Sequence, residues 1–246
     1  LKKMLRLLVT SRTFKQNSGQ RPDLVDPENR SFGRGPSYRL DAEGLRAVSL
    51  WSSSLLDPSM GGEGVKPYQP PGMWKELMHP GSNTKNYVAD KGPRLYRRSL
   101  YVYWKRTSPH PMMTLFDAPS RETACVRRSR TNTPLQSLAL FNEPQRVEAA
   151  RKLAERLLRE ADNDEARFDL LFTLIASRQP KDIERSACSK LLHTQRTRYL
   201  AKEGEAQALL AIGNAPLDGK LKPVEAAAWT QVAGTALASD LAILLY

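Results

Sequence analysis

The chain has 246 residues, of which 40% are hydrophobic and 26% are charged, so it is long enough to bury a sizeable core. Its formal net charge of +12 arises in residues 1–130, which hold 23 Lys and Arg against 11 Asp and Glu, whereas residues 131–246 hold 15 of each. No stretch reaches the roughly 18–20 apolar residues of a membrane span, which excludes a transmembrane helix. A basic half beside a neutral half suggests a surface that faces a polyanion. Buried arginine–carboxylate pairs beneath a solvated surface are the alternative.

Residues that commonly hold cofactors are few and scattered. Cys125 and Cys188 either form one disulfide or remain free thiols, because sequence does not establish their separation. The chain lacks the C-x-x-C-H motif that attaches c-type haem, and it lacks the spacing of a four-ligand zinc site. Its three histidines lie far apart in the sequence. We therefore expect no cofactor in this chain.

The N-terminal segment, LKKMLRLLVTSRTF, predicts an amphipathic helix with Met4, Leu5, Leu8 and Val9 on one face. A cation interrupts its apolar run and no small-residue cleavage site follows, which argues against a signal peptide. Because the chain begins with Leu inside this helical pattern, we expect a fragment of a longer protein. Residues 17–36 are rich in Gly, Pro, Asp and Asn and predict a loop.

A second helix is predicted after this loop. Asp41 is a candidate N-cap, and Leu45, Val48 and Trp51 form the expected inner face. This helix is expected to end near Asp57, which precedes a proline.

The following segments are short and irregular. Residues 61–71 are rich in Gly and Pro and exclude a regular element, whereas residues 73–77 predict one short helix. Residues 97–106 are the best candidate for a strand, because alternation places Val102 on one side and Tyr103 on the other. A helix is the alternative, since periodicity alone does not assign a short apolar run.

Residues 131–246 show a helical pattern. Thr133 is a candidate N-cap, Pro134 follows as the first helical residue, and Pro144 begins a second helix. Further helices are predicted to begin at Asp164, Pro180 and Pro223, and the last is expected to continue to the C-terminus. The short connections between them predict antiparallel neighbours.

These elements predict a mainly α fold. We expect an irregular, loop-rich basic half over residues 1–130, with at most a short strand, packed on a C-terminal helical bundle over residues 131–246. The two halves are expected to form a single domain.

One dense stretch, residues 95–144, makes the chain recognisable through its residues 98–144: RSLYVYWKRTSPHPMMTLFDAPSRETACVRRSRTNTPLQSLALFNEP. It closely resembles a domain of large planctomycete proteins, the family catalogued as domain of unknown function 1553. Four further segments fit the same resemblance: residues 7–16, 26–46, 61–77 and 147–160. The C-terminal SDLAILLY departs from the polar end expected of the family.

The resemblance implies a mostly helical fold and an extracytoplasmic, periplasmic setting. Such proteins commonly carry a planctomycete-type cytochrome c domain and a second uncharacterised domain ahead of this one. The implied partners are therefore haem-bearing or other domains of the same polypeptide, and any c-type haem would lie in another domain. The family supplies no reaction.

Asp117, Arg121 and Glu122 form the best polar cluster for catalysis. A carboxylate beside an arginine can bind substrate hydroxyls or act as a general base. Asp41 and Glu43 could supply the second carboxylate that a glycoside hydrolase needs. The alternative is that Asp117 caps a turn and Arg121 pairs with a carboxylate.

An anion-binding site is predicted where the helical half begins. Arg127, Arg128 and Arg130 precede Asn132 and Thr133, and a helix start offers free N–H groups and a positive dipole end. Sulfate, phosphate or a uronate carboxylate would suit these groups. The alternative is that the arginines tie the loop-rich half to the bundle through carboxylates and carbonyl groups.

Aromatic and cationic residues alternate just upstream. Tyr103 and Trp104 lie beside Lys105 and Arg106, a mixture that can stack sugars and neutralise an anionic polymer. Core packing with cations that reach to solvent is the alternative. His110 lies between two prolines and is expected in a stiff, exposed loop.

These observations leave three hypotheses for function. The first is a non-catalytic binding or scaffolding domain that engages an acidic polysaccharide or a partner domain. The second is a hydrolase or lyase that acts on such a polymer with Asp117 and Glu122. The third is a structural module that docks a haem domain. Nucleic acid is not an expected partner, because no nucleic-acid-binding module is present.

Overall fold

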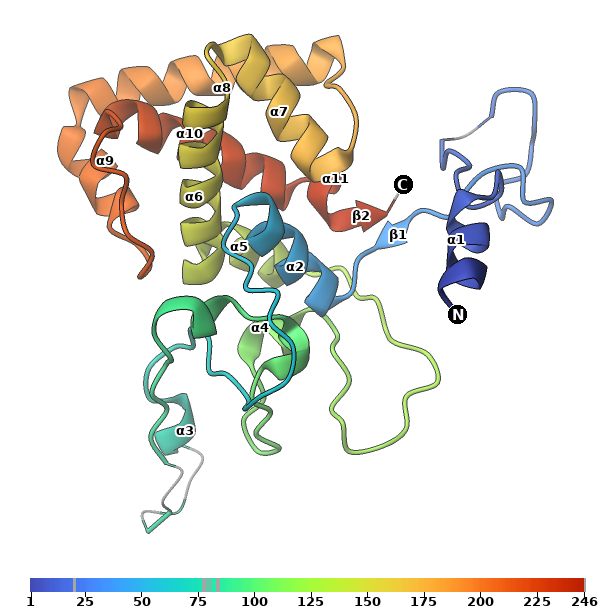
Figure 1. Cartoon of the computed structure of the whole chain (residues 1–246), viewed down its shortest axis with the longest axis horizontal. Coiled ribbons are helices and arrows are strands. Elements are labelled where there is room, and N and C mark those ends of the chain that lie inside the picture. Colours follow the sequence, from blue (N-terminus) through green and yellow to red (C-terminus); the bar gives the residue numbers. More distant parts are fainter. Residues whose placement is uncertain (20, 77–78, 80, 83–84, 246) are drawn as a thin grey trace. The chain divides into compact units, whose positions relative to one another are not determined.

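The computed structural model describes residues 1–19, 21–76, 79, 81–82 and 85–245 (Figure 1). The chain divides into two compact units. Unit 1 comprises residues 1–40 together with 243–246, and unit 2 comprises Asp41–Ala242. Eleven α-helices and one two-stranded sheet lie in the described residues, which confirms the mainly α fold. Every helix among the described residues is too short or too polar to span a lipid bilayer.

Unit 1 contains α1 (Lys2–Thr10) and a short antiparallel sheet. Strand β1 (Tyr38–Arg39) pairs with β2 (Leu244–Leu245), and Tyr38 lies opposite Leu245. The predicted N-terminal helix is confirmed, but it buries none of its residues. The C-terminal helix was predicted to continue to the chain end; instead the last described residues pair as a strand.

Helices α6 to α10 build the main core of unit 2. Their bounds are Pro144–Glu160 for α6, Asp164–Ala176 for α7, Asp182–Ala201 for α8, Glu203–Leu210 for α9 and Pro223–Ala238 for α10. The predicted helices in this region are confirmed, and α9 is an additional one. Helix α10 packs against each of the other four and crosses α6 in Figure 1. A short helix, α11 (Asp240–Ile243), follows α10.

Small side chains set the contact between α6 and α10. Gly234 on α10 faces Ala150 on α6, and a Cβ atom at position 234 would lie 3.5 Å from that of Ala150. Ala154 on α6 and Ala227 and Ala233 on α10 are buried in the same core cluster. Trp229 is fully buried nearby, and its ring centroid lies 5.1 Å from that of Phe168. Trp229 and Phe168 thus pack in the same core as the close contact between Gly234 and Ala150.

The first part of unit 2 is less regular. Helix α2 (Ala42–Ser52) begins after Asp41, as predicted, and buries Leu45. Two details of its prediction were wrong: the helix ends at Ser52 and not near Asp57, and Trp51 is 54% exposed. Helix α3 spans Met73–Glu76, α4 spans Pro111–Leu115 and α5 spans Pro134–Asn142.

The strand predicted over residues 97–106 is absent. That segment follows a 3-10 helix, η1 (Gly92–Tyr96), and contains a second, η2 (Ser99–Tyr101), with only isolated bridges at Arg97 and Val102. Contacts to other segments hold this one in place: the buried Arg97 guanidinium donates hydrogen bonds to carbonyl groups of residues 59, 61 and 63. Cys125 and Cys188 are free thiols, and burial raises the pKa of Cys188.

A buried charge on α6 joins the irregular segments to the bundle. Glu148 is 0% exposed, and its Oε1 accepts hydrogen bonds from Tyr96 Oη at 2.9 Å, Tyr68 Oη at 3.2 Å and the Ala215 amide at 2.6 Å. Arg151 Nη2 lies 4.0 Å from the same oxygen and donates to the Ala215 carbonyl. Burial and the Glu148 charge raise the pKa of Tyr68 to about 12.

Removal of this carboxylate should destabilise the fold strongly. We expect Glu148→Ala to lower the free energy of unfolding by about 3–5 kcal/mol, because it leaves three buried hydrogen-bond donors unpaired and removes one of the two carboxylates beside Arg151, which keeps its pair with Glu155. Urea denaturation followed by circular dichroism measures the change. Glu160→Ala, which breaks the solvent-exposed pair with Arg156, is the control and should cost less than about 1 kcal/mol. Equal losses in the two variants would contradict the role given to Glu148.

Candidate functional site

The two carboxylates predicted for catalysis lie in structural contacts. Asp117 has φ of 63° and accepts hydrogen bonds from the Thr131 amide at 2.8 Å and from its hydroxyl. It therefore joins the two ends of the segment 118–130. Glu122 is exposed and forms a two-point ion pair with Arg106, and the hydrogen bond from this guanidinium lowers its pKa. The catalytic role of Asp117 and Glu122 stays a prediction.

Two of the predicted ligand-binding arginines also have protein partners. The Arg121 guanidinium lies 4.6 Å from the centre of the Trp104 ring, whose Nε1 donates to the Ser120 carbonyl. Arg128 Nη1 lies 2.7 Å from Glu43 and 3.4 Å from Asp41, and these contacts raise its pKa. The carboxylates considered as partners for Asp117 therefore bind Arg128.

The helix start predicted for anion binding is closed by the protein itself. Thr133 is the N-cap of α5, as predicted, and forms a reciprocal capping box with Gln136. Gln136 also donates to the Leu115 carbonyl, which ties α5 to α4. Arg127, Arg130 and Asn132 are exposed beside this cap. Anion binding by these residues stays a prediction.

Tyr103 belongs to a cluster of rings and cations. Its ring centroid lies 5.8 Å from that of the buried Trp74. Lys105 Nζ lies 4.0 Å from the Trp74 centroid, and Lys66 Nζ lies 5.6 Å from that of Tyr103. Partial burial and the neighbouring Lys66 charge lower the pKa of Lys105.

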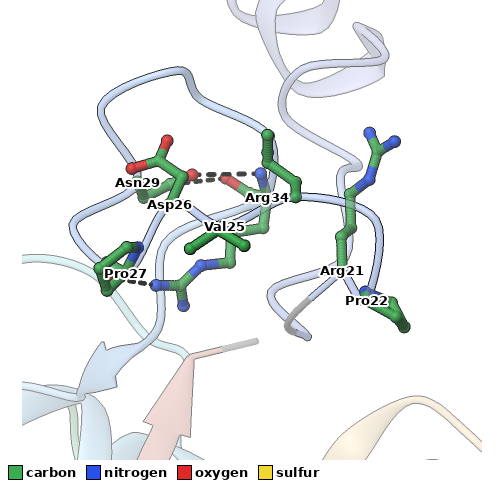
Figure 2. A pocket seen from close by; sticks show the side chains of 9 residues that line it. Arg21, Pro22, Val25, Asp26, Pro27, Asn29 and Arg34 are labelled. Carbon is green, nitrogen blue, oxygen red and sulfur yellow. Dashed lines mark hydrogen bonds between the residues drawn. The ribbon is translucent and has the colours of Figure 1, made fainter.

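Unit 1 contains a hollow of about 300 Å³ in the loop before β1 (Figure 2). The Asn29 side chain bonds to both the amide and the carbonyl of Arg34, and Arg34 Nη2 donates to the Pro27 carbonyl. Asp26 accepts from two backbone amides of the same loop. These polar groups form hydrogen bonds within the loop, so they do not point together at a place where a ligand would bind.

Unit 2 contains a groove of about 570 Å³ with mostly apolar walls. It is lined by residues 68–71, 110–112 and 142–144 and by Leu115, Leu135, Leu138 and Ala139. Leu135 is 63% exposed and Leu138 is 59% exposed, although both lie on a well-capped helix. Below, "the groove" denotes this set of residues. Rigid apolar walls with few polar groups are typical of ligand-binding sites.

His110 is the main polar group of the groove wall. The prediction of an exposed loop histidine was wrong: His110 is 4% exposed and precedes α4. Its Nε2 lies 3.0 Å from the Tyr68 carbonyl, and its Nδ1 has no hydrogen-bond partner among the described residues. Burial and, to a smaller extent, the Arg46 charge lower the pKa of His110 to about 4. The ring is therefore neutral at physiological pH.

A small cavity of about 30 Å³ adjoins the groove, and His110 and Glu143 line both. Burial lowers the pKa of Arg46 and of Arg146 to about 10 and raises that of Glu143. Arg46 donates to the carbonyl groups of residues 95 and 97 and to Gln145. The Nε, Nη1 and Nη2 atoms of Arg46 all donate to these uncharged groups, which leaves the guanidinium few N–H groups for a ligand.

Sequence reasoning missed the groove. One signal was available: the apolar residues of α5 exceed a single face, since Leu140 is buried whereas Leu135, Leu138 and Phe141 are exposed. The opposite wall, residues 68–71, carried no signal because it lies in a turn-rich segment. Among the described residues, no group of three or more His, Cys, Asp or Glu side chains is placed to hold a metal ion.

The His110 ring predicts a pH dependence of stability. The pKa of His110 is about 4 in the folded protein and about 6.5 in the unfolded chain, so the unfolded chain binds a proton first as the pH falls. The free energy of unfolding is therefore unaffected by His110 above pH 6.5 and decreases as the pH falls from 6.5 towards 4. We expect this histidine to cost about 3 kcal/mol of unfolding free energy at about pH 4. Urea denaturation of wild type and His110→Gln, near neutral pH and at about pH 4, measures the difference. The variant should lose less stability on acidification; equal losses would contradict the assignment.

Residues 1–192 match the model of a family, PSD1, described as "Protein of unknown function (DUF1553)". The match ends within α8 and leaves α9 and α10 outside it. No curated protein and no solved structure matches the chain. Because the family model covers well over half of the chain, the protein belongs to the DUF1553 family of proteins of unknown function.

Proposed function

We propose that the chain is a non-catalytic binding or scaffolding domain and that the groove is its binding surface. The observation that supports this most is the exposure of Leu135 and Leu138 on a helix whose first turn is closed by a capping box. Large apolar side chains held in water on a rigid support mark interaction surfaces. The groove offers these side chains together with a small number of polar groups, the usual composition of a recognition site.

The opposite wall of the groove is equally well supported. Tyr68 bonds through its hydroxyl to the buried Glu148 and through its carbonyl to His110. A ligand would therefore meet a preformed surface and would pay little conformational entropy for ordering it. This favours binding over a lid that closes on a substrate.

The partner we propose is another domain of the same polypeptide, with a haem-bearing domain as the first candidate. The support is the resemblance of the dense stretch to cytochrome-linked planctomycete proteins. An extracytoplasmic, periplasmic location is part of the same proposal. The apolar character of the groove suits an intramolecular partner, which is present at high effective concentration.

An acidic polysaccharide is a second candidate ligand, at a different place in unit 2. Lys66 and Lys105 both lie over the Trp74 ring, at 5.9 Å and 4.0 Å from its centroid. Desolvation and, after it, the repulsion from Lys66 lower the pKa of Lys105, and a sulfate or carboxylate group bound between the two lysines would relieve that repulsion. The exposed Tyr103 ring beside them can stack on a sugar.

The groove should bind a neutral apolar fluorophore. We expect N-phenylnaphthylamine to gain fluorescence with the wild-type chain and Leu138→Asp to lower its affinity about tenfold or more, because a charge in the groove wall must be desolvated. Ile183→Asp is the matched control, since Ile183 is 77% exposed on α8 away from the groove. Equal loss in both variants, or no loss in either, would contradict the groove as the binding surface.

The polysaccharide candidate predicts retention on a sulfated-glycan gel. The double variant Lys66→Ala/Lys105→Ala should elute at clearly lower salt than wild type, because it loses two contacts between a lysine ammonium group and a sulfate group of the glycan. A variant with Arg127→Ala, Arg128→Ala and Arg130→Ala removes more charge and tests the helix start separately. If both variants elute according to net charge alone, neither cluster is a specific site.

A further inference from the structure

A long irregular segment of unit 2 connects α4 to α5 and runs out from the helices and back (Figure 1). Residues 116–133 contain no helix or strand, and every residue from 120 to 127 is exposed. The Thr131 amide donates to Asp117 at 2.8 Å and closes the segment 118–130 at its base. Exposed loops are the places where proteases most often cut a folded protein.

The backbone in the middle of this segment is not held by the fold. Among the described residues, no hydrogen bond joins an amide or carbonyl group of residues 123–129 to another part of the protein. A protein that binds an extended peptide does so by pairing with its main-chain N–H and C=O groups, and a protease binds its substrate in this way. Because no contact in the fold competes for these groups, residues 123–129 are able to enter a protease active site.

The segment contains four arginines, and contacts within the protein occupy two of them directly. Arg121 has φ of 65°, which is not an extended conformation, and its guanidinium lies 4.6 Å from the centre of the Trp104 ring. Arg128 forms an ion pair with Glu43 at 2.7 Å. A protease that recognises arginine must withdraw the guanidinium from these contacts before it cuts at either residue.

The other two arginines differ in the peptide bond that follows them. The bond after Arg130 leads to Thr131, whose amide already donates to Asp117. Arg127 is exposed, lies beside the fully exposed Val126, and has no hydrogen bond, ion pair or ring contact among the described residues. Arg127 therefore combines an available guanidinium with an available backbone.

We propose that the bond between Arg127 and Arg128 is a processing site for a protease that cuts after arginine. Such a protease holds the guanidinium of the preceding residue in a pocket that contains a carboxylate. Hydrolysis consumes one water molecule, breaks the C–N bond, and leaves a carboxylate on Arg127 and an ammonium group on Arg128. This inference goes beyond the proposed function, because it involves no residue of the groove.

The cut protein should remain one folded particle. Glu148, which lies after the cut, accepts hydrogen bonds from Tyr68 and Tyr96, which lie before it. Arg46 donates to Gln145 across the same division at 2.6 Å. These buried contacts join residues 1–127 to residues 128–246 without the intact segment.

The test is limited digestion of the whole 246-residue chain with trypsin, with the fragments identified by mass spectrometry. Within the segment 118–130 we expect the first cut after Arg127, and the two fragments should elute together in size-exclusion chromatography. Arg127→Gln should slow cutting anywhere in the segment about tenfold or more, because the pocket of the protease loses its charge partner and the other arginines are less available. Arg121→Gln is the matched control and should leave the rate unchanged.

A synthetic peptide of residues 118–130 separates the effect of the fold from that of the local sequence. The peptide lacks the ion pair with Glu43, so trypsin should cut it after Arg128 as readily as after Arg127. The same selectivity in peptide and protein would overturn the assignment. A first cut in the protein after Arg121, Arg128 or Arg130, or continued cutting of Arg127→Gln at the wild-type rate, would overturn it as well.

Discussion

A buried carboxylate on α6 is the constraint on which the rest of unit 2 depends. Glu148 lies inside the protein and accepts hydrogen bonds from Tyr68, Tyr96 and Ala215, which come from three segments far apart in the sequence. Such a charge is tolerated only when its partners are held in place, so the carboxylate enforces the geometry of all three segments. Gly213 shows how tight this is: its φ is 94°, and a Cβ there would lie 2.4 Å from the carboxylate.

This constraint extends to the groove. The Tyr68 hydroxyl binds Glu148, its carbonyl receives the His110 Nε2–H group, and residues 68–71 continue directly into the proline wall. On the other side, α5 is fixed by its capping box and by the bond from Gln136 to the Leu115 carbonyl. Both walls are thus positioned by polar contacts outside the groove. The groove remains apolar and open, while the basic segment 118–130 is held separately through Asp117.

The helices whose first turns are set by neighbouring residues could be predicted from the sequence. Helix periodicity and caps placed α5 and α6 correctly, because Thr133 and Pro134 act on their own first turn. The candidate site was not predictable in the same way, since each side chain found its partner elsewhere in the chain. Arg128 pairs with Glu43, 85 residues away, and the buried His110 bonds to the carbonyl of Tyr68, 42 residues away. The false strand near Arg97 has the same cause, because alternation within a short segment does not reveal contacts to distant carbonyl groups.

The claim that Glu148 holds the wall of the groove is tested most directly by amide hydrogen exchange. Exchange followed by mass spectrometry in wild type and in Glu148→Ala measures how firmly residues 63–69 are held, because Tyr68 donates to this carboxylate. The account predicts that these amides exchange faster in the variant while those of α8 stay protected. Unchanged exchange of residues 63–69 in the variant would contradict it.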